Sequence, residues 1–326
     1  MVTLLLAPDS FKGTMSAETV ATALADGVTA AGGTPLPCPL ADGGEGTDSV
    51  LHAALGGTLT ETTVSGPLGQ PVRGRFLLTP DGRTAVVATA AASGLGLVPP
   101  DRRDAEAATS TGTGELLVAA ARAGAERILL GVGGSACTDG GAGALQAIAA
   151  GGGLGTAELI VLCDVRTAFE DAAIVYAPQK GAGPAAVERL TARLHHVAGS
   201  LPRDPRGVAR TGAAGGLSGA LWAVHHASLV SGIDAVLAEV DFEALLRRAD
   251  LVVTGEGCLD AQTAQGKVVS GVARRCAAAG VPVVAVVGRS RLDPRGRADL
   301  GLTTVIEAGD PASLRAAAIQ IVAGRR

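Results

Sequence analysis

The sequence has little of what nucleic-acid-binding and membrane proteins usually need. Aromatic residues make up only 2% of the 326 positions, and 27 basic residues are outnumbered by 31 acidic ones, which gives a net charge of −4. Without a basic surface or aromatic stacking platforms, binding to nucleic acid is not expected. The longest apolar stretches, such as residues 86–98, fall short of a membrane span, and the first residues lack the basic region of a signal peptide.

Cysteine is also sparse and carries no recognisable pattern. The five cysteines are odd in number and include no C-x-x-C pair: Cys38, Cys137, Cys163, Cys258 and Cys276. Such scattered cysteines are typical of a reduced protein without a zinc site. We therefore expect a soluble, cytoplasmic protein with no membrane partner.

Lysine is the rarest of the charged residues, and asparagine is missing. The three lysines are Lys12, Lys180 and Lys267, and each stands beside a glycine. A lysine is a compact point charge, and beside an open glycine backbone it is well suited to reach a phosphate. Codon bias explains why lysine is scarce, but it does not explain where lysine is kept.

The apolar pattern predicts an α/β protein. Apolar residues make up 47% of the chain, so with few aromatics the core must be built from Ala, Val and Leu. The chain opens with a strand–helix–strand–helix pattern and ends on the same alternation, which favours a parallel sheet. Strands are expected near 2–6, 36–40, 251–254, 281–287 and 302–306, and helices near 16–31 (with Ser16 as N-cap), 47–54, 266–279 and 311–323.

The middle of the chain differs. Residues 58–64, 72–79 and 84–88 are β-rich runs separated by Gly/Pro turns, which predicts an antiparallel meander. Helices near 113–124, 139–150, 184–199 and 212–227 and strands at 127–132 and 159–163 follow. We therefore predict two domains: a discontinuous, doubly wound parallel-sheet domain (1–57 and 230–326) and an inserted α/β domain (58–229).

Four of the expected strands are followed by loops that combine glycine with acidic residues. In open α/β sheets ligands bind outside the carboxyl ends of the strands, so these loops are expected to meet at one site. Glycine permits close backbone approach, and helix N-termini offer free N–H groups to anionic oxygens. Carboxylates among such loops indicate a cation, and Mg²⁺ bound by one or two carboxylates plus phosphates fits best. The loops are residues 7–13, 41–47, 131–141 and 254–260.

Simpler interpretations of these residues stay open. Asp42 and Glu45 have the spacing of a helix-capping pair, and Asp139 could cap the helix that follows it. Lys180 could be a solvated loop charge. Lys267, in contrast, would stand in the first turn of a helix, where a cation opposes the macrodipole unless an anion binds there.

Established nucleotide motifs fit poorly. No G-x-x-x-x-G-K-[ST] pattern occurs, and Gly131-x-Gly133-x-x-Ala136 matches a dinucleotide fingerprint that is weak when it stands alone. The adjacent histidine pairs at 195–196 and 225–226 point to different helix faces and are interpreted as surface or packing residues.

The loops do resemble those of a known family, the bacterial glycerate kinases, which are ATP-dependent enzymes that phosphorylate D-glycerate. The resemblance runs in order over nearly the whole chain. Its motifs are Ala7–Gly13, Ala41–Thr47, Ser65–Gly69, Gly112–Leu116, Gly133–Gly141, Cys163–Val165, Ala177–Ala182, Gly212–Gly216, Thr254–Gly257 and Gly266–Lys267. It implies a Rossmann-like domain interrupted by a second α/β domain, with the active-site cleft between them.

The chain departs from the family pattern at three places. Ala88 replaces an acid, Thr138 replaces an asparagine, and the stretch after Asp164 is shortened and lacks an Asn-Pro-Leu-Gly pattern. The resemblance therefore supports the kinase chemistry more strongly than it supports the identity of the acceptor.

With this resemblance, the loops are assigned roles in phosphoryl transfer from ATP, with Mg²⁺, to D-glycerate, with 2-phosphoglycerate as the favoured product. The expected catalytic residues are Asp42, which orients or deprotonates the hydroxyl, and Lys12 and Lys267, which neutralise phosphoryl oxygens. The expected substrate-binding residues are Asp9, Ser10 and Lys180. The expected nucleotide-binding residues are Gly133, Gly134, Ser135, Gly255 and Gly257, and the expected Mg²⁺ ligands are Asp139, Glu256 and Asp260.

Two alternatives are carried with this assignment. One is a kinase of a related small hydroxy acid or polyol, and the other is a nucleotide- or anion-binding regulatory module without turnover. A homodimer is left open as the oligomeric state. We expect the three lysines to converge on the interdomain cleft.

Overall fold

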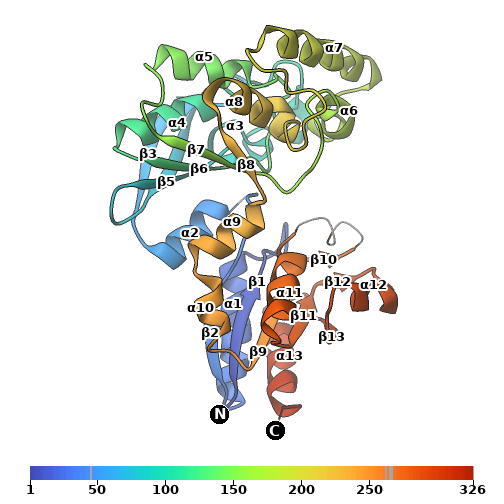
Figure 1. Ribbon diagram of the computed structural model, residues 1–326. Coiled ribbons are helices and arrows are strands. Elements are labelled where there is room, and N and C mark those ends of the chain that lie inside the picture. The colour runs from blue at the N-terminus through green and yellow to red at the C-terminus, as the bar shows by residue number, and fades with distance from the viewer. Residues whose placement is uncertain (45, 261–262, 264–266, 326) are drawn as a thin grey trace. The chain divides into compact units, whose positions relative to one another are not determined.

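The protein consists of two compact units. The computed structural model describes residues 1–44, 46–260, 263 and 267–325. Unit 1 comprises Met1–Asp42 and Ile233–Arg326, and unit 2 is the segment Gly43–Gly232 between them. Both are α/β units built around a sheet with parallel strands, as the sequence predicted (Figure 1).

Unit 1 contains an entirely parallel five-stranded sheet. In spatial order its strands are β13 (Thr304–Glu307), β11 (Val283–Val287), β9 (Leu251–Gly255), β1 (Thr3–Pro8) and β2 (Thr34–Pro37). Its helices are α1 (Ala17–Ala30), α9 (Gly232–Glu239), α10 (Phe242–Leu246), α11 (Val268–Ala279), α12 (Pro294–Asp299) and α13 (Pro311–Ala323). A short parallel pair, β10 (Cys258–Leu259) and β12 (Arg289–Ser290), lies beside the main sheet.

The three inner strands β11, β9 and β1 of this sheet are largely continuous apolar runs because helices cover both faces of the sheet. Leu4 and Leu6 of β1 pack in one cluster with Leu24 of α1 and Leu314 of α13. The intervening Leu5 is also fully buried, and α11 contacts β1, β9 and β11. Since successive side chains of a strand point to opposite faces, α11 covers the second face.

Local signals place the helices of unit 1. The Ser16 hydroxyl accepts a hydrogen bond from the Thr19 N–H at 3.2 Å, so Ser16 is the N-cap of α1 as expected. Asp310 and Ser313 form a capping box at the start of α13. Gly27 lets α1 approach α13, because a Cβ at this position would lie 2.3 Å from the Arg315 carbonyl oxygen.

Unit 2 contains a mixed six-stranded sheet. In spatial order its strands are β3 (Thr58–Ser65), β4 (Pro71–Leu78), β5 (Thr84–Ala88), β6 (Arg127–Gly131), β7 (Glu158–Leu162) and β8 (Ser228–Val230). The first three form the expected antiparallel meander, and the pairs from β5 to β8 are parallel. The structure therefore confirms the meander at 58–88.

Helices pack on both sides of this sheet, with α4 and α5 on one side and α2 on the other (Figure 1). The helices of unit 2 are α2 (Thr47–Leu55), α3 (Ala90–Ser93), α4 (Thr111–Arg122), α5 (Ala142–Ala150), α6 (Ala172–Tyr176), α7 (Pro184–Ser200) and α8 (Leu217–His225). Four 3₁₀ turns join them: Leu95–Leu97, Pro100–Arg102, Pro178–Lys180 and Ala213–Gly216. No helix in the described ranges is long and apolar enough to cross a membrane.

The boundaries of unit 2 differ from those inferred from the sequence. The unit starts at Gly43 rather than near residue 58, and it ends at Gly232. Helix α2 therefore belongs to unit 2, where it contacts β4 and β5. The Asp48 carboxylate at the start of α2 forms an ion pair with Arg75 of β4 at 2.9 Å. Such a long-range contact leaves no trace in the local sequence pattern.

Small aliphatic residues fill both cores, as the composition required. The few large aromatic side chains are used there too: Phe11 and Phe242 are buried in unit 1, and Phe76 and Phe169 in unit 2. Alanine, valine and leucine supply most of the remaining buried apolar side chains.

Candidate active site

The carboxyl ends of three adjacent strands in unit 1 bring together acidic and lysine side chains. Because β1 lies between β9 and β2 in the parallel sheet, the loops after these strands emerge at the same edge. They carry Asp9 and Lys12 (after β1), Asp42 (after β2) and Glu256 (after β9). This is the edge at which open α/β sheets bind ligands. The fourth glycine- and acid-containing loop, residues 131–141, follows β6 in unit 2.

Asp9 is the most strongly perturbed acid of this edge. Its side chain is buried, its Oδ1 accepts a 2.6 Å hydrogen bond from the Ser10 N–H, and its own N–H donates to the Gly255 carbonyl at 2.8 Å. Burial and, to a smaller extent, the neighbouring Asp42 carboxylate raise the pKa of Asp9 from 3.8 to about 7. The Ser10 hydrogen bond and Lys12 act in the opposite direction. Asp9 therefore titrates near neutral pH.

Lys12 reaches from the same loop toward Asp42. The Lys12 ammonium lies 4.0 Å from Asp42 Oδ2, and the side chains are 75% and 15% exposed. An ion pair this exposed is weak, because water solvates the ammonium. The geometry leaves the charge of Lys12 accessible to an anionic ligand beside the Asp42 carboxylate.

A second acid–lysine pair lies at the end of β9. Lys267 Nζ is 4.0 Å from Glu256 Oε2, and Glu256 is buried. Burial raises the pKa of Glu256, while a 2.5 Å hydrogen bond from the Thr263 hydroxyl and the Lys267 charge lower it. Lys267 is the N-cap residue of α11 and makes no side-chain capping bond, so its cation stands at the positive end of the helix dipole, as the sequence indicated. The neighbouring Gly266 of the family motif lies outside the described residues.

Thr263 was not singled out from the sequence. Its hydroxyl binds Glu256 and also accepts a hydrogen bond from the Asp260 N–H at 3.1 Å. It thus ties together two of the acids that were expected to bind Mg²⁺. Only the folded loop reveals this role, because a threonine in such a loop carries no motif of its own.

The glycines of this edge allow the loops to approach one another closely. A Cβ on Gly255 would lie 1.9 Å from the Val286 carbonyl oxygen, and one on Gly257 would lie 3.2 Å from Phe11 Cα. Gly288 follows β11, and its N–H donates to the Glu256 carbonyl at 3.1 Å. A Cβ on Gly288 would lie 2.6 Å from the Gly257 carbonyl oxygen, so no side chain fits there. Gly255 and Gly257 therefore have a structural role that does not depend on a nucleotide. The Gly288 loop was not recognised in the sequence.

The Gly131–Gly133 segment of unit 2 is packed in a similar way. An added Cβ would lie 2.7 Å from the Gly43 carbonyl oxygen at Gly131 and 2.4 Å from Gly44 Cα at Gly133. Backbone packing thus accounts for the two glycines of the dinucleotide-like pattern. Gly134 adopts a left-handed conformation, with φ of 70°, and accepts a hydrogen bond from the Leu95 N–H.

Asp139 is held by protein donors on all sides. Its carboxylate accepts hydrogen bonds from the Ser110 N–H and hydroxyl, both at 2.8 Å, and from the N–H groups of Gly141 and Gly143 at 3.0 and 3.2 Å. It therefore satisfies N–H groups at the start of α5, although it is not the N-cap residue of this helix, which is Gly141. Asp42 does not cap α2, whose N-cap is Gly46; the partner expected for it, Glu45, lies outside the described residues.

Lys180 belongs to unit 2, whereas Lys12 and Lys267 belong to unit 1. Its side chain is buried, and its ammonium donates to Ser135 Oγ at 3.2 Å and to the Cys137 carbonyl at 2.5 Å. Burial lowers the pKa of Lys180. The solvated-loop interpretation of Lys180 is therefore wrong.

Metal binding would rest on few protein ligands. Within residues 1–44, 46–260, 263 and 267–325, no three His, Cys, Asp or Glu side chains form a metal-binding group. Glu256 and Asp260 interact electrostatically in one loop of unit 1, whereas Asp139 lies in unit 2. Two carboxylates match the small protein share of many Mg²⁺ sites, in which phosphates and water complete the shell.

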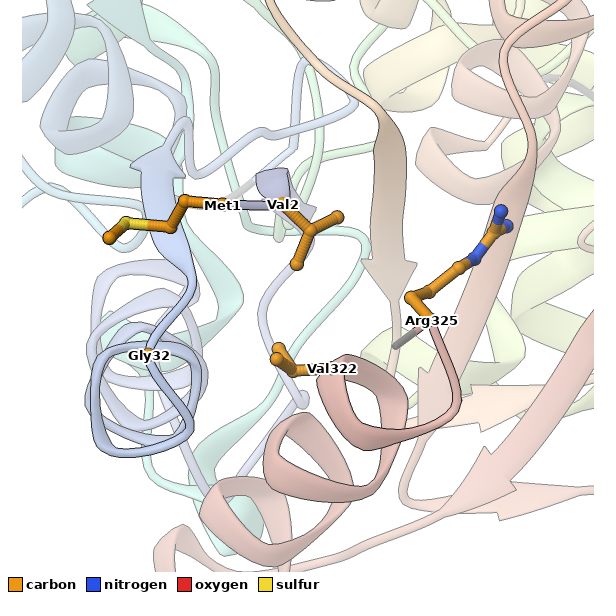
Figure 2. A pocket seen from close by; sticks show the side chains of 5 residues that line it. All are labelled: Met1, Val2, Gly32, Val322 and Arg325. Carbon is orange, nitrogen blue, oxygen red and sulfur yellow. The ribbon is translucent and has the colours of Figure 1, made fainter.

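Two other features do not contribute to this site. Cys137 is fully buried, and burial raises the pKa of its thiol to about 12, so it is not a reactive nucleophile. A hollow of about 380 Å³ opens beside the start of β1, at the opposite end of this strand from the acidic loop that follows it, and Figure 2 shows the residues that line it. Both ends of the chain line it, through Met1, Val2, Gly32, Val322 and Arg325, and it contains no acid.

Comparison with known proteins agrees with the resemblance seen in the loops. A protein-family model described as "Glycerate kinase family" matches residues 4–153 and 152–321. A glycerate kinase of Bacillus subtilis (strain 168) is 43% identical over 325 residues, covering 87% of this chain and 84% of the relative. A glycerate 2-kinase of Escherichia coli (strain K12) is 38% identical over 322 residues, with coverage of 87% and 84%.

A solved structure extends the likeness to the fold. The crystal structure of a protein described as glycerate kinase 2 from Salmonella typhimurium LT2 matches with a TM-score of 0.86 and 36% identity. The match covers 100% of this chain and 98% of that one.

Proposed function

Since this chain belongs to the glycerate kinase family of ATP-dependent enzymes, we propose that it transfers the γ-phosphoryl group of ATP to the 2-hydroxyl of D-glycerate, giving 2-phosphoglycerate and ADP. The observation that carries the proposal is the edge formed by β9, β1 and β2. Two carboxylates there have raised pKa values (Asp9 and Glu256), and two lysines (Lys12 and Lys267) lie 4.0 Å from acids. Phosphoryl transfer needs mainly this combination of positioning and charge neutralisation.

Asp42 is the proposed proton acceptor. Its side chain is partly exposed beside Lys12, so a substrate hydroxyl can reach the carboxylate while the ammonium contacts a phosphoryl oxygen. Asp9, which is coupled electrostatically to Asp42, and Ser10 are proposed to hold the acceptor in place. Lys267 is proposed to neutralise phosphoryl charge at the start of α11, where the helix dipole also favours an anion.

Mg²⁺ is the proposed cofactor, with Glu256 and Asp260 as its protein ligands. A divalent cation would supply charge neutralisation for the phosphates of ATP. It suits Glu256 because a buried carboxylate with a raised pKa gains most from a cation. We propose a different part for Asp139, whose oxygens accept hydrogen bonds from Ser110, Gly141 and Gly143. It supports the Gly133–Ser135 loop, for which we propose contact with anionic oxygens of the substrates.

Identification of the product tests the proposed reaction. Purified protein is incubated with Mg-ATP and D-glycerate, and ³¹P NMR of the mixture distinguishes 2-phosphoglycerate from 3-phosphoglycerate. We expect the 2-phosphate together with an equal amount of ADP. Formation of the 3-phosphate would refute the regiochemistry, and ADP release only with another acceptor would refute the substrate.

One observation favours a related hydroxy acid as a second candidate acceptor. Thr138, which replaces an asparagine of the family pattern, is fully buried, and its hydroxyl has no hydrogen-bond partner among the residues described. The altered position lies next to Asp139 in the loop after β6. A panel of small hydroxy acids and polyols in the ADP-release assay separates this candidate from D-glycerate. A module without turnover would bind nucleotide but release no ADP with any acceptor of the panel.

The proposed location is the cytoplasm. All five cysteines are unpaired, in keeping with a reducing compartment.

A further inference from the structure

Lys180 is a buried cation whose hydrogen-bond partners in the described residues are both uncharged. It ends the 3₁₀ turn Pro178–Lys180, and only 2% of its surface is exposed. Its ammonium donates to Ser135 Oγ and to the Cys137 carbonyl. Within the described part of the chain it forms no ion pair, and Asp139 and the Cys137 thiol are the titratable groups that act on it from nearby. Burying an ammonium without an ion-pair partner costs desolvation free energy, so a functional reason for keeping this lysine is expected.

The reason lies in what Lys180 does to the Ser135 hydroxyl. An ammonium has three donors and no acceptor, whereas a hydroxyl has one donor and two acceptor lone pairs. Because Ser135 Oγ accepts a hydrogen from Lys180, its own hydrogen must point elsewhere. The only hydrogen bond of the Ser135 hydroxyl in the described residues is the one it accepts from Lys180, so its own hydrogen is available to a ligand. Ser135 keeps 8% of its surface exposed, enough for a ligand atom to reach it.

Backbone hydrogen bonds hold the loop on both sides of Ser135. The Gly134 carbonyl accepts from the Leu95 N–H at 2.8 Å, and the Ala136 N–H donates to the Ser93 carbonyl at 2.8 Å. These bonds fix the backbone on both sides of Ser135, and Lys180 fixes the hydroxyl itself. The Ser135 hydroxyl is thereby oriented as a hydrogen-bond donor, with the Lys180 ammonium 3.2 Å from its oxygen.

We propose that Lys180 is a positioning residue that turns the Ser135 hydroxyl into a fixed donor for an anionic oxygen of a substrate. It does so without touching the substrate, which differs from the direct carboxylate contact expected from the sequence. The inference rests on the proposed function, because the anionic oxygen belongs either to an ATP phosphate or to the glycerate carboxylate. A hydrogen bond to a charged oxygen, backed by the Lys180 charge, accounts for about a 10- to 100-fold effect on binding.

Steady-state kinetics of four full-length variants test this. They are Ser135→Ala, Ser135→Thr, Lys180→Met and the double variant Ser135→Ala/Lys180→Met. We expect Ser135→Ala and Lys180→Met to raise the same KM about 10- to 100-fold with a much smaller change in kcat, and Ser135→Thr, which keeps the hydroxyl, to restore it. The double variant should be no worse than Ser135→Ala alone, because both changes remove one coupled donor. A rise in KM for ATP identifies a phosphate as the partner, and a rise in KM for D-glycerate identifies the carboxylate.

Other results would overturn the inference. If Ser135→Ala changed neither KM, the hydroxyl would not be a substrate donor. If the effects of the two single changes multiplied in the double variant, Lys180 would act independently of Ser135. Lys180→Met should fold, because methionine keeps the apolar stem of the side chain and removes the buried charge. If Lys180→Met does not fold, Ser135→Ala still tests whether the hydroxyl is a donor to substrate.

A failure of the proposed function is recognised separately. If the unmodified protein released no ADP with D-glycerate, the Kd values for ADP and D-glycerate, measured by calorimetry on the same variants, would still test the donor. Weaker binding of one of the two to Ser135→Ala and Lys180→Met would support it, and unchanged binding of both would refute it.

Discussion

Replacement of Asp9 by asparagine should stabilise unit 1 at neutral and alkaline pH while impairing catalysis. In the folded protein burial and the Asp42 charge raise the pKa of Asp9 from 3.8 to about 7, and the charged groups that face it are Asp42, Lys12 and Glu256. The folded state therefore binds a proton more tightly than the unfolded state does. Stability that this proton provides is fully present below pH 4 and is lost as the pH rises to about 7.

The size of the effect follows from the two pKa values. Each pH unit between them lowers the free energy of unfolding by about 1.4 kcal/mol, so about 4 kcal/mol is lost in all, as an upper limit because Asp42 shares the titration. An asparagine keeps the acceptor for the Ser10 N–H and carries no charge. Asp9→Asn should therefore flatten this part of the pH profile and exceed the unmodified protein in stability at pH 8.

Hydrogen exchange of the β1 peptide is the suitable measurement, because it reports on unit 1 alone. The single tryptophan, Trp222, lies in α8 of unit 2, so its fluorescence on denaturation serves as an internal control that should not change. Asp26→Asn, at an exposed position on α1, is the matched control. The reasoning is refuted if Asp9→Asn retains the pH slope of the unmodified protein, or if it is the less stable of the two at pH 8.

Two further predictions concern packing and thiol reactivity. Gly255→Ala should destabilise unit 1 by about 1–3 kcal/mol, since its Cβ would lie 1.9 Å from the Val286 carbonyl oxygen. Gly309→Ala, whose Cβ would have no neighbour nearer than 4.0 Å, should be close to neutral. Denaturation followed by circular dichroism compares the two variants, and equal stabilities would contradict the packing argument. Cys258 is the only one of the five cysteines that is not buried, so it should be the first to react with iodoacetamide in the native protein. Mass spectrometry identifies the labelled cysteine. Faster labelling of Cys137, which is fully buried, would contradict this and would show that the loop after β6 exposes its thiol to solvent.

Much of the fold could be predicted because local signals agree with the tertiary structure. The three inner strands of unit 1 are buried on both faces, so they appear as apolar runs such as Leu4–Leu6, and the Ser16 cap marks the start of α1. The start of unit 2 could not be predicted, because α2 is held there by contacts such as Asp48–Arg75 that join distant segments. The short elements α6, α9, α10, α12 and β8 were missed for a similar reason, since few residues give little periodicity.

The acids and lysines of the site could be identified from the sequence, but not their grouping. That Asp9 lies between the loops of Asp42 and Glu256 depends on β1 lying between β2 and β9 in the sheet, which is a property of strand order. The partners of Glu256 and Lys180, the hydroxyls of Thr263 and Ser135, likewise follow only from the folded loops. Sequence motifs show which residue types are gathered, and the fold decides which of them interact.

The most direct test of the central claim is the kcat of Asp42→Asn with D-glycerate and Mg-ATP. The claim is that the carboxylates at the edge of β9, β1 and β2 carry out phosphoryl transfer. Loss of a general base at this edge should lower kcat by about 10²- to 10⁴-fold in a protein that is still folded by circular dichroism. A kcat within about threefold of the unmodified enzyme would place the chemistry elsewhere in the molecule.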